Sequence, residues 1–219
     1  EVIPVLVQDE LSTVRASAIS ALAMIPTRLP NVLPAIDKHV WPAAKPGDSG
    51  LVPVRAAALK ALGILAHEEP FKGDAQALIR IAGALDVCSR DQSLVVRMRA
   101  GWSLASLCEN SSMVKQATSS EYLKHHAGLT LLRLAELSLR LMADNDKVRV
   151  YGARALGNLG HAEEFVRFIA GATSEETAAK ICERVEGELG RVISTETYSV
   201  KVRWNACHAA GLLLGNPLT

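Results

Sequence analysis

The fold follows from the segment DKVRVYGARALGNL, residues 146–159. Small or apolar residues stand three, seven and ten positions after its Val-Arg pair, at Gly152, Leu156 and Leu159. In an α-helix of 3.6 residues per turn, these positions and the valine lie on one face. The segment therefore predicts a helix with an apolar stripe and with a small residue where a neighbouring helix comes close.

The same pattern occurs four more times, in STVRASAISALAMI from Ser12, VPVRAAALKALGIL from Val52, LVVRMRAGWSLASL from Leu94 and SVKVRWNACHAAGLLL from Ser199. The arginines of the five pairs, spaced 40, 42, 52 and 54 residues apart, are Arg15, Arg55, Arg97, Arg149 and Arg203. Five copies with aligned offsets indicate a structural repeat. We expect the helices that carry the pattern near residues 12–26, 52–67, 93–109, 146–160 and 199–214.

Each helix that carries the pattern is preceded by another apolar segment and a polar turn. We therefore call the pattern-bearing helices the second helices of their repeats and the preceding ones the first helices. We expect the first helices near residues 1–8, 31–44, 74–88, 121–143 and 174–194, with the last two longer to account for the wider spacing. Aspartates that can cap or favour the second helices stand before the first four Val-Arg pairs, at Asp9, Asp48, Asp91 and Asp144. No linker divides the chain, so residues 1–219 are expected to form one continuous solenoid.

The Asp…Val-Arg…Ala…Ala-Leu-Gly…Leu pattern resembles the HEAT repeat over essentially the whole chain. This resemblance implies an all-α fold, a right-handed α-α superhelix of HEAT or armadillo type with about five two-helix repeats. The stretches DNDKVRVYGARALGNLG and KVRWNACHAAGLLLGNP are more closely similar to HEAT repeat-containing protein six and its relatives. Two features depart from the family pattern: Gly152 replaces an alanine, and the fifth pair lacks the preceding aspartate.

The apolar character of both terminal segments bears on the ends of the solenoid. EVIPVLVQ at the start and AAGLLLGNPLT at the end lack the polar surface that a terminal repeat needs. We therefore expect the chain to be part of a longer protein whose further repeats cover one or both ends, or these ends to meet other chains.

Composition is that of an ordinary globular chain, with 49% hydrophobic and 21% charged residues and a net charge of +1. This balance lacks the basic excess of a dedicated nucleic-acid binder. The four cysteines show no CxxC spacing and are expected to be reduced thiols, which suits an intracellular protein, cytoplasmic or nuclear. No run of about 18 apolar residues predicts a membrane span.

The sequence contains no pattern that predicts catalysis. Phosphate-binding loops, GxSxG and HExxH motifs are absent. His67-Glu68 resembles the iron-binding pairs of one hydroxylase with this type of repeat, but such a site needs several pairs and His161 is followed by Ala162. The sequence therefore predicts a protein that is not an enzyme and that has no cofactor or metal site.

The five arginines of the Val-Arg pairs, which we call the arginine ladder, have two possible roles. The HEAT resemblance implies that they pair with nearby aspartates and satisfy loop carbonyls, which ties repeats together. Asp9, Asp91 and Asp144 are the candidate partners. The alternative is a basic surface for recognition. The structural role is favoured because a half-buried charge needs a partner within the fold.

The residues two, five, nine and twelve positions after each arginine form an outward face that avoids the apolar stripe. The resemblance implies that second helices line the concave side of the superhelix. On this face the chain places the candidate partner-binding residues Lys60, Arg99, Trp102, Tyr151, Arg154, Asn158, Asn205 and His208. The alternative for Trp102 and Tyr151 is packing between successive helices, whereas Trp41 and Trp204 are expected to pack within the fold.

These residues predict a non-catalytic scaffold or adaptor that binds a protein, as a helix or an extended peptide, on the concave face. Arginine, tryptophan and tyrosine dominate the energetics of protein interfaces. The alternative partner is a nucleic acid, held by a local basic patch of Lys60, Arg99, Arg154, Lys147 and Lys201. Steep salt dependence of binding would favour the nucleic acid.

Overall fold

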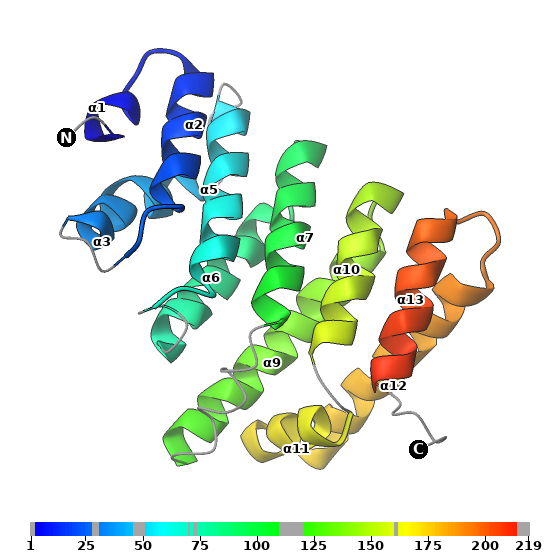
Figure 1. Ribbon diagram of the computed structural model, residues 1–219. Helices are drawn as coiled ribbons and strands as arrows, with labels where there is room; N and C mark the ends of the chain where they lie inside the picture. Colours follow the sequence, from blue (N-terminus) through cyan, green and yellow to red (C-terminus); the bar gives the residue numbers. More distant parts are fainter. Residues whose placement is uncertain are drawn as a thin grey trace. The chain divides into compact units, whose positions relative to one another are not determined.

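The computed structural model describes residues 3–27, 31–45, 51–69, 71, 74–109, 121–159 and 162–213. Every regular element within these ranges is helical (Figure 1). The chain divides into two compact units, residues 1–107 and 108–219. The predicted all-α solenoid fold of HEAT or armadillo type is confirmed at this level, because each unit is built of helix pairs packed side by side. A single continuous solenoid stays a prediction.

The first unit contains three of the predicted second helices, α2 (Ser12–Leu22), α5 (Val52–Leu65) and α7 (Leu94–Cys108). The first helices are α1 (Ile3–Leu6), an interrupted helix at residues 32–43, and α6 (Ala75–Cys88). The interrupted helix consists of α3 (Val32–Ala35), the π-helical turn η1 (Ile36–Val40) and α4 (Trp41–Ala43). Pro42 has no N–H to donate to the preceding turn, and the change of helix type lies just before it.

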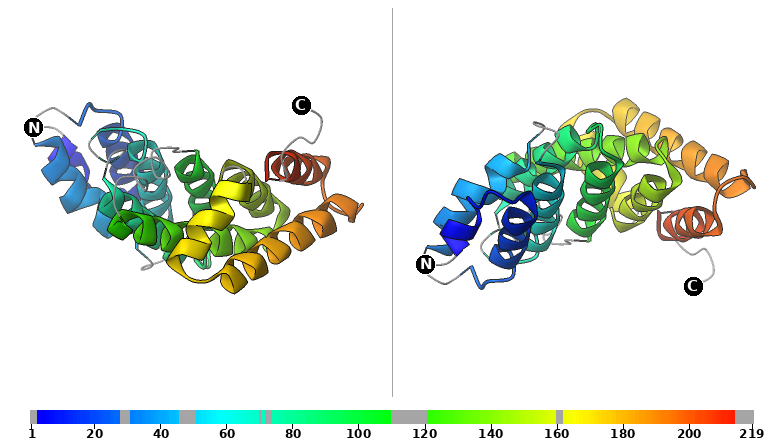
Figure 2. Two further views of the ribbon diagram at one scale, coloured as in Figure 1. Left: turned by 90° about the horizontal axis from the view of Figure 1, so that it is seen from below. Right: turned by 90° about the horizontal axis from the view of Figure 1, so that it is seen from above.

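The second unit contains α9 (Glu121–Met142), α10 (Asp146–Asn158), α11 (Ala162–Ala172), α12 (Glu175–Ser194) and α13 (Val200–Leu213). Helix α10 packs against α9 and α13, and α12 packs against α11 and α13. The neighbouring positions of α10 and α13 are visible in each view of Figures 1 and 2.

Helix α11 was not expected from the sequence. It corrects the expectation that a longer first helix accounts for the spacing of 54 residues between Arg149 and Arg203. The final repeat has three helices, and α11 packs against both α9 and α12. Gly128 of α9 permits this contact, because a Cβ there would lie 2.4 Å from the Cβ of Ala172. The chain at this crossing therefore needs a glycine.

The predicted apolar stripe forms the core of the repeats. The valine of the Val-Arg pair is buried in four copies, and the small residue three positions after the arginine is buried in all five. Ala58, Ala206, Leu62 and Leu156 have no exposed surface. Gly152, which departs from the family pattern, lies where α10 meets α9, since a Cβ there would be 2.7 Å from the main-chain oxygen of Ser138.

The aspartates before the second helices lie close to the helix starts, as expected. Asp9 Oδ1 accepts a hydrogen bond from Leu11 N, and Asp91 Oδ1 accepts one from Ser93 N. The N-cap of α10 is Asn145 rather than the expected Asp144, and its side chain accepts a hydrogen bond from Lys147 N. Asp48 lies outside the described residues.

Candidate functional site

Arg55 of the ladder joins two successive repeats in the first unit. Its Nε donates to Asp91 Oδ2 at 2.9 Å and its Nη2 to Asp91 Oδ1 at 3.3 Å. The side chains of Arg55 and Asp91 are only 6% and 5% exposed. Such a bidentate geometry compensates the cost of removing both charges from water. Asp91 belongs to the turn before α7, so the contact holds α5 to the start of the following repeat.

The other ladder arginines donate hydrogen bonds to main-chain carbonyl oxygens of nearby turns. Arg15 Nη1 reaches the oxygens of Asp9 and Glu10, and Arg97 Nη1 reaches those of Asp91 and Gln92 at 2.9 and 3.0 Å. Arg203 Nε donates to the oxygen of Ile193 at 3.1 Å. A helix end leaves carbonyls without intrahelical partners, and a guanidinium can satisfy several of them.

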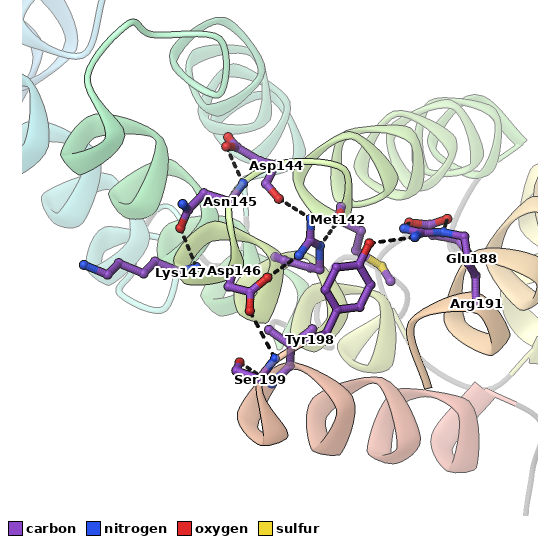
Figure 3. Close-up of polar contacts among 11 residues, drawn as sticks. Met142, Asp144, Asn145, Asp146, Lys147, Glu188, Arg191, Tyr198 and Ser199 are labelled. Atoms are coloured by element: carbon purple, nitrogen blue, oxygen red, sulfur yellow. Dashed lines mark hydrogen bonds and ion pairs between the residues drawn. The ribbon is translucent and has the colours of Figure 1, made fainter. Parts of the chain in front are cut away.

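Arg149 binds three residues of a polar cluster in the second unit, Met142, Asp144 and Asp146, which are labelled in Figure 3. It donates from Nε to Met142 O, from Nη2 to Asp144 O and from Nη1 to Asp146 Oδ1. Its guanidinium carbon also lies 4.0 Å from the ring centroid of Tyr198. These contacts link the end of α9 to the start of α10 and to the turn before α13.

Two further contacts complete this cluster. Asp146 Oδ2 accepts a hydrogen bond from Ser199 N at 3.1 Å, across the two successive repeats. Tyr198 accepts a hydrogen bond from Arg191, which also binds Glu188. The hydrogen bonds with Glu188 and then Tyr198 raise the pKa of Arg191, because both favour its charged form. The turn before α13, which lacks the aspartate that precedes the other Val-Arg pairs, is thus held by Tyr198 and Ser199.

In the first unit, Arg99 is exposed, whereas Lys60 and Trp102 are half-buried. His67 was expected to be a surface histidine without a metal-binding role, and it is half-buried. Its Nε2 lies 2.9 Å from the main-chain oxygen of Ser106 and 3.0 Å from the hydroxyl oxygen of the same residue. Because His67 is the twelfth residue after one ladder arginine and Ser106 the ninth after the next, these outward positions also connect repeats.

In the second unit, Arg154 and Asn158 share the carboxylate of Glu109. Arg154 Nη2 donates to Glu109 Oε1 at 2.5 Å, and Asn158 Nδ2 donates to the same oxygen at 3.1 Å. The side chains of Arg154 and Glu109 remain 52% and 39% exposed, so the cluster faces solvent. Tyr151 of the same helix is half-buried. Glu109 therefore joins the predicted residues and places a negative charge beside Arg154.

Helix α13 carries an exposed aromatic pair that contains one predicted residue and one unexpected residue. The expectation that Trp204 packs within the fold is wrong, since its side chain is 62% exposed. Its ring stacks on that of His208, with centroids 5.4 Å apart and planes at 16°. Asn205, also predicted, is half-buried and donates to the main-chain oxygen of Lys201.

Trp41 packs within the fold as expected. It is 5% exposed, and the guanidinium carbon of Arg80 lies 3.9 Å from its ring centroid. The position of Trp204 immediately after its arginine is buried in two other repeats, at Ala56 and Val150, and half-buried in the remaining two, at Ala16 and Met98. The local sequence therefore held no signal of the exposure of Trp204, whereas Glu109 is in phase with the predicted outward face.

The predicted patch has members in both units. Lys60, Arg99 and Trp102 belong to the first unit, and the remaining predicted residues belong to the second. Within the second unit, α10 and α13 pack against each other, and their outward positions supply Tyr151, Arg154, Asn158, Asn205 and His208. A single continuous patch across both units stays a prediction.

None of the four cysteines is in a disulfide. Cys88 and Cys108 are buried, and burial raises the pKa of both thiols, that of Cys88 to about 11. Desolvation and the nearby Glu186 also raise the pKa of Cys182. Cys207 is the exposed cysteine, on α13.

Within the ranges that the structure describes, no three His, Cys, Asp or Glu side chains are grouped closely enough to hold a metal ion. The described helices also include none with both the length and the hydropathy required to cross a membrane.

Comparisons with known proteins give a distant relative and solved structures of low similarity. No family model matches the chain. An uncharacterized protein of Dictyostelium discoideum is 35% identical over 106 residues, which cover 48% of this chain and 7% of the relative. The chain thus matches only a small part of that protein's length.

Two solved structures show the range of structural similarity. An engineered protein is 19% identical with a TM-score of 0.38, and the match covers 98% of each chain. A designed armadillo repeat protein in complex with the peptide (KR)4 is 15% identical with a TM-score of 0.33, covering 95% of this chain and 98% of that one.

Proposed function

We propose that this chain is a non-catalytic scaffold that binds a protein partner, as a helix or an extended peptide, along the outward face of its second helices. The observation that carries this proposal is the cluster of Glu109, Arg154 and Asn158 on the exposed side of α10. The neighbouring helix α13 adds the exposed pair of Trp204 and His208.

The contacts of Glu109 favour binding because they hold two partner-binding groups in place before a partner arrives. Arg154 has five N–H donors, and the hydrogen bond with Glu109 leaves part of the guanidinium accessible at 52% side-chain exposure. A side chain that is already ordered loses less entropy when it binds. The accessible donors suit carboxylates and main-chain carbonyls of a peptide.

The exposed aromatic rings supply the apolar part of the same surface. Trp204 offers a large flat area at 62% exposure, and its stacking on His208 restricts its motion. Tryptophan and arginine are enriched among the residues that dominate interface energies. A peptide with an acidic or amide side chain near an apolar one fits this combination.

Nucleic acid is the second candidate, through Lys60, Arg99, Arg154, Lys147 and Lys201. The position of Glu109 disfavours a nucleic-acid partner, because its carboxylate beside Arg154 repels phosphate. The affinity for a nucleic acid would also fall steeply as the salt concentration rises, because binding releases counterions from the phosphates.

The proposal is tested by affinity capture with immobilised chain, with mass spectrometry of the proteins retained. Three forms are compared: wild type, the double variant Trp102→Ala/Arg154→Ala, and the control Ser17→Asp/Ser20→Asp on α2. We expect proteins that wild type and control retain equally and that the double variant loses, at both low and high salt. Retention that is equal for all three forms, or that depends on nuclease-sensitive material, would refute the proposal.

We also propose, from the two phrases in α10 and α13, that the closer resemblance is to HEAT repeat-containing protein six and its relatives, and that the protein acts inside the cell. Immunofluorescence of the tagged full protein tests the second statement, and staining confined to the exterior of the cell would contradict it.

A further inference from the structure

The outward face of α10 and α13 carries two lysines at equivalent positions. Lys147 and Lys201 each stand two residues before the ladder arginine of their helix, and α10 and α13 pack against each other. This position lies on the same helix face as the outward positions two, five and nine residues after the arginine. Both side chains are exposed, and neither ammonium has an ion-pair partner among the contacts that the structure describes. We call Lys147 and Lys201 the lysine pair.

Charge is distributed unevenly among the helices of the second unit. Helices α10 and α13 together contain five lysines and arginines and one acidic residue, Asp146. Helix α12 instead contains five glutamates and three basic residues. The Asp146 carboxylate is occupied within the fold, because it accepts hydrogen bonds from Arg149 and from Ser199 N. The lysine pair therefore leaves the outward face with positive charge that no residue of α10 or α13 balances.

The chemistry of this face changes along the helices. The charge of Arg154, in the middle of the face, is balanced by the carboxylate of Glu109. Leu212 of α13 is 38% exposed, and its Cδ1 lies 3.5 Å from a Cβ added at Gly157 of α10. Leu212 follows the lysine of its own helix by eleven residues, which is about 16 Å at the rise of an α-helix. The face thus has a cationic end and an apolar end.

We infer that this face binds an extended peptide with two acidic residues close together and an apolar residue about five positions away. The two carboxylates face the lysine pair, and the apolar side chain packs on Leu212. An extended chain rises about 3.3 Å per residue, so five residues cover the distance between the two ends of the face. Lysine has a flexible stem, so each ammonium adjusts to one carboxylate. This chemistry of the partner rests on the proposed function, since it assigns a peptide to the same surface.

An acidic peptide fits this face better than a nucleic acid, which the lysine pair would also attract. A nucleic-acid strand carries a negative charge at every phosphate and therefore needs cations along its whole path. The lysine pair lies at one end of the face, whereas Glu109 lies beside Arg154 and Leu212 marks the other end. A carboxylate and an apolar side chain both disfavour contact with phosphate. A peptide instead places its acidic and apolar side chains separately.

Selection of random dodecapeptides displayed on phage, with the immobilised full chain as bait, tests the inference. We expect wild type to enrich peptides with two aspartates or glutamates within about three positions and an apolar residue about five positions away. Lys147→Glu/Lys201→Glu reverses the charge of the lysine pair and should enrich lysine and arginine there instead. Lys180→Glu/Arg184→Glu is the matched control, because it makes the same change of charge at exposed positions of α12, and it should select the wild-type peptides.

Fluorescence anisotropy with the most enriched acidic peptide measures the affinities. The variant with the reversed lysine pair should bind this peptide about tenfold more weakly than wild type, and Leu212→Ser should bind it about fivefold more weakly. An oligothymidylate of the same length should bind wild type more weakly than the peptide does. Circular dichroism melts establish that all variants are folded.

Enriched peptides without the acidic pattern, or the same peptides for wild type and the reversed lysine pair, would overturn the inference and leave the proposed function standing. Tighter binding of the oligothymidylate would assign the lysine pair to a nucleic acid and overturn it as well. Enrichment of no peptide by any form would have the same consequence. The proposed function is judged separately by affinity capture, because Trp102→Ala/Arg154→Ala leaves the lysine pair unchanged.

Discussion

Arg55 and Asp91 form an ion pair between two successive repeats in which both side chains are at least 94% buried, with Nε and Oδ2 2.9 Å apart. Asp91 also accepts a hydrogen bond from Ser93 N at the start of α7. One carboxylate therefore organises the turn before its own helix and neutralises an arginine of the preceding helix. This double role gives the Asp–Val-Arg pattern a physical basis at this repeat.

Replacing Asp91 with alanine should strongly destabilise the fold. The change removes the Asp91 carboxylate from the buried guanidinium of Arg55, and breaking such a buried ion pair costs about 3–5 kcal/mol. Chemical denaturation measures the free energy of unfolding. The control is Asp37→Ala, which breaks the exposed pair of Asp37 and Arg80 and should cost less than about 1 kcal/mol. Similar losses for both variants would show that burial does not determine the strength of the Arg55 contact.

Replacing Arg149 with alanine should lower the free energy of unfolding by about 1–3 kcal/mol, because carbonyls at the end of α9 and the Asp146 carboxylate lose a donor. Partner binding should weaken only as far as folding does. Arg184→Ala is the control, since that side chain is exposed and 3.9 Å from Glu136. Unchanged thermal stability together with lost binding would instead assign the ladder to recognition.

Replacing Gly152 with alanine should destabilise the second unit although alanine is the better helix former. The new Cβ would lie 2.7 Å from Ser138 O and 2.9 Å from Met142 N, and main-chain atoms of α9 cannot move aside cheaply. Gly187→Ala, in open space on α12, should instead stabilise by up to about 1 kcal/mol. Thermal melts of both variants should shift in opposite directions; equal shifts would contradict the close approach of α9 and α10.

Replacing both Trp102 and Arg154 with alanine should weaken binding of the captured partner by at least about 2 kcal/mol without unfolding the chain. Both residues are partly exposed, so the fold loses little when they are truncated. Isothermal titration calorimetry measures the affinity, with Ser17→Asp/Ser20→Asp as the control that should bind like wild type. A partner that binds both variants with equal affinity would place the binding surface elsewhere.

Stability should decline at alkaline pH in part through Cys88. Burial, with a smaller contribution from Asp91, raises the pKa of this thiol from 9.0 to about 11 in the folded chain. The thiol is neutral when protonated, so the native state keeps its proton to higher pH than the unfolded state. Its stabilising contribution is complete below about pH 9 and is lost as pH rises toward 11.

Denaturation series at several pH values measure this effect, and Cys88→Ala should flatten the decline between pH 9 and 11 relative to wild type. Cys207→Ala is the control, because that cysteine is exposed. The same variants allow assignment of thiol labelling in the native state, where Cys207 should react first. A decline that is unchanged in Cys88→Ala would contradict the role of this buried thiol.

The sequence alone determined the second helices and their buried stripe. Residues such as Val148 and Leu156 are placed on one face by the period of the helix, which is a local property of the backbone. The arginine spacing then located all five repeats. The sequence also predicts that Glu109, Arg154 and Asn158 lie on the outward face of their helices, because this placement follows from the same helical period.

Only the tertiary structure decided which residues of different helices meet. The segment that forms α11 contains the pair Val166-Arg167, but polar residues stand seven and ten positions after its arginine, so the apolar stripe does not continue. The contact of Gly128 with Ala172 brings α11 onto α9. Asp91 could have paired with its own repeat's arginine, and the approach of α5 brings its carboxylate to Arg55. Trp204 stands at a position that is buried or half-buried in the other repeats, and its exposure depends on what lies against α13. Such contacts join residues far apart in the sequence, and helical periodicity specifies a face but not the neighbour that covers it.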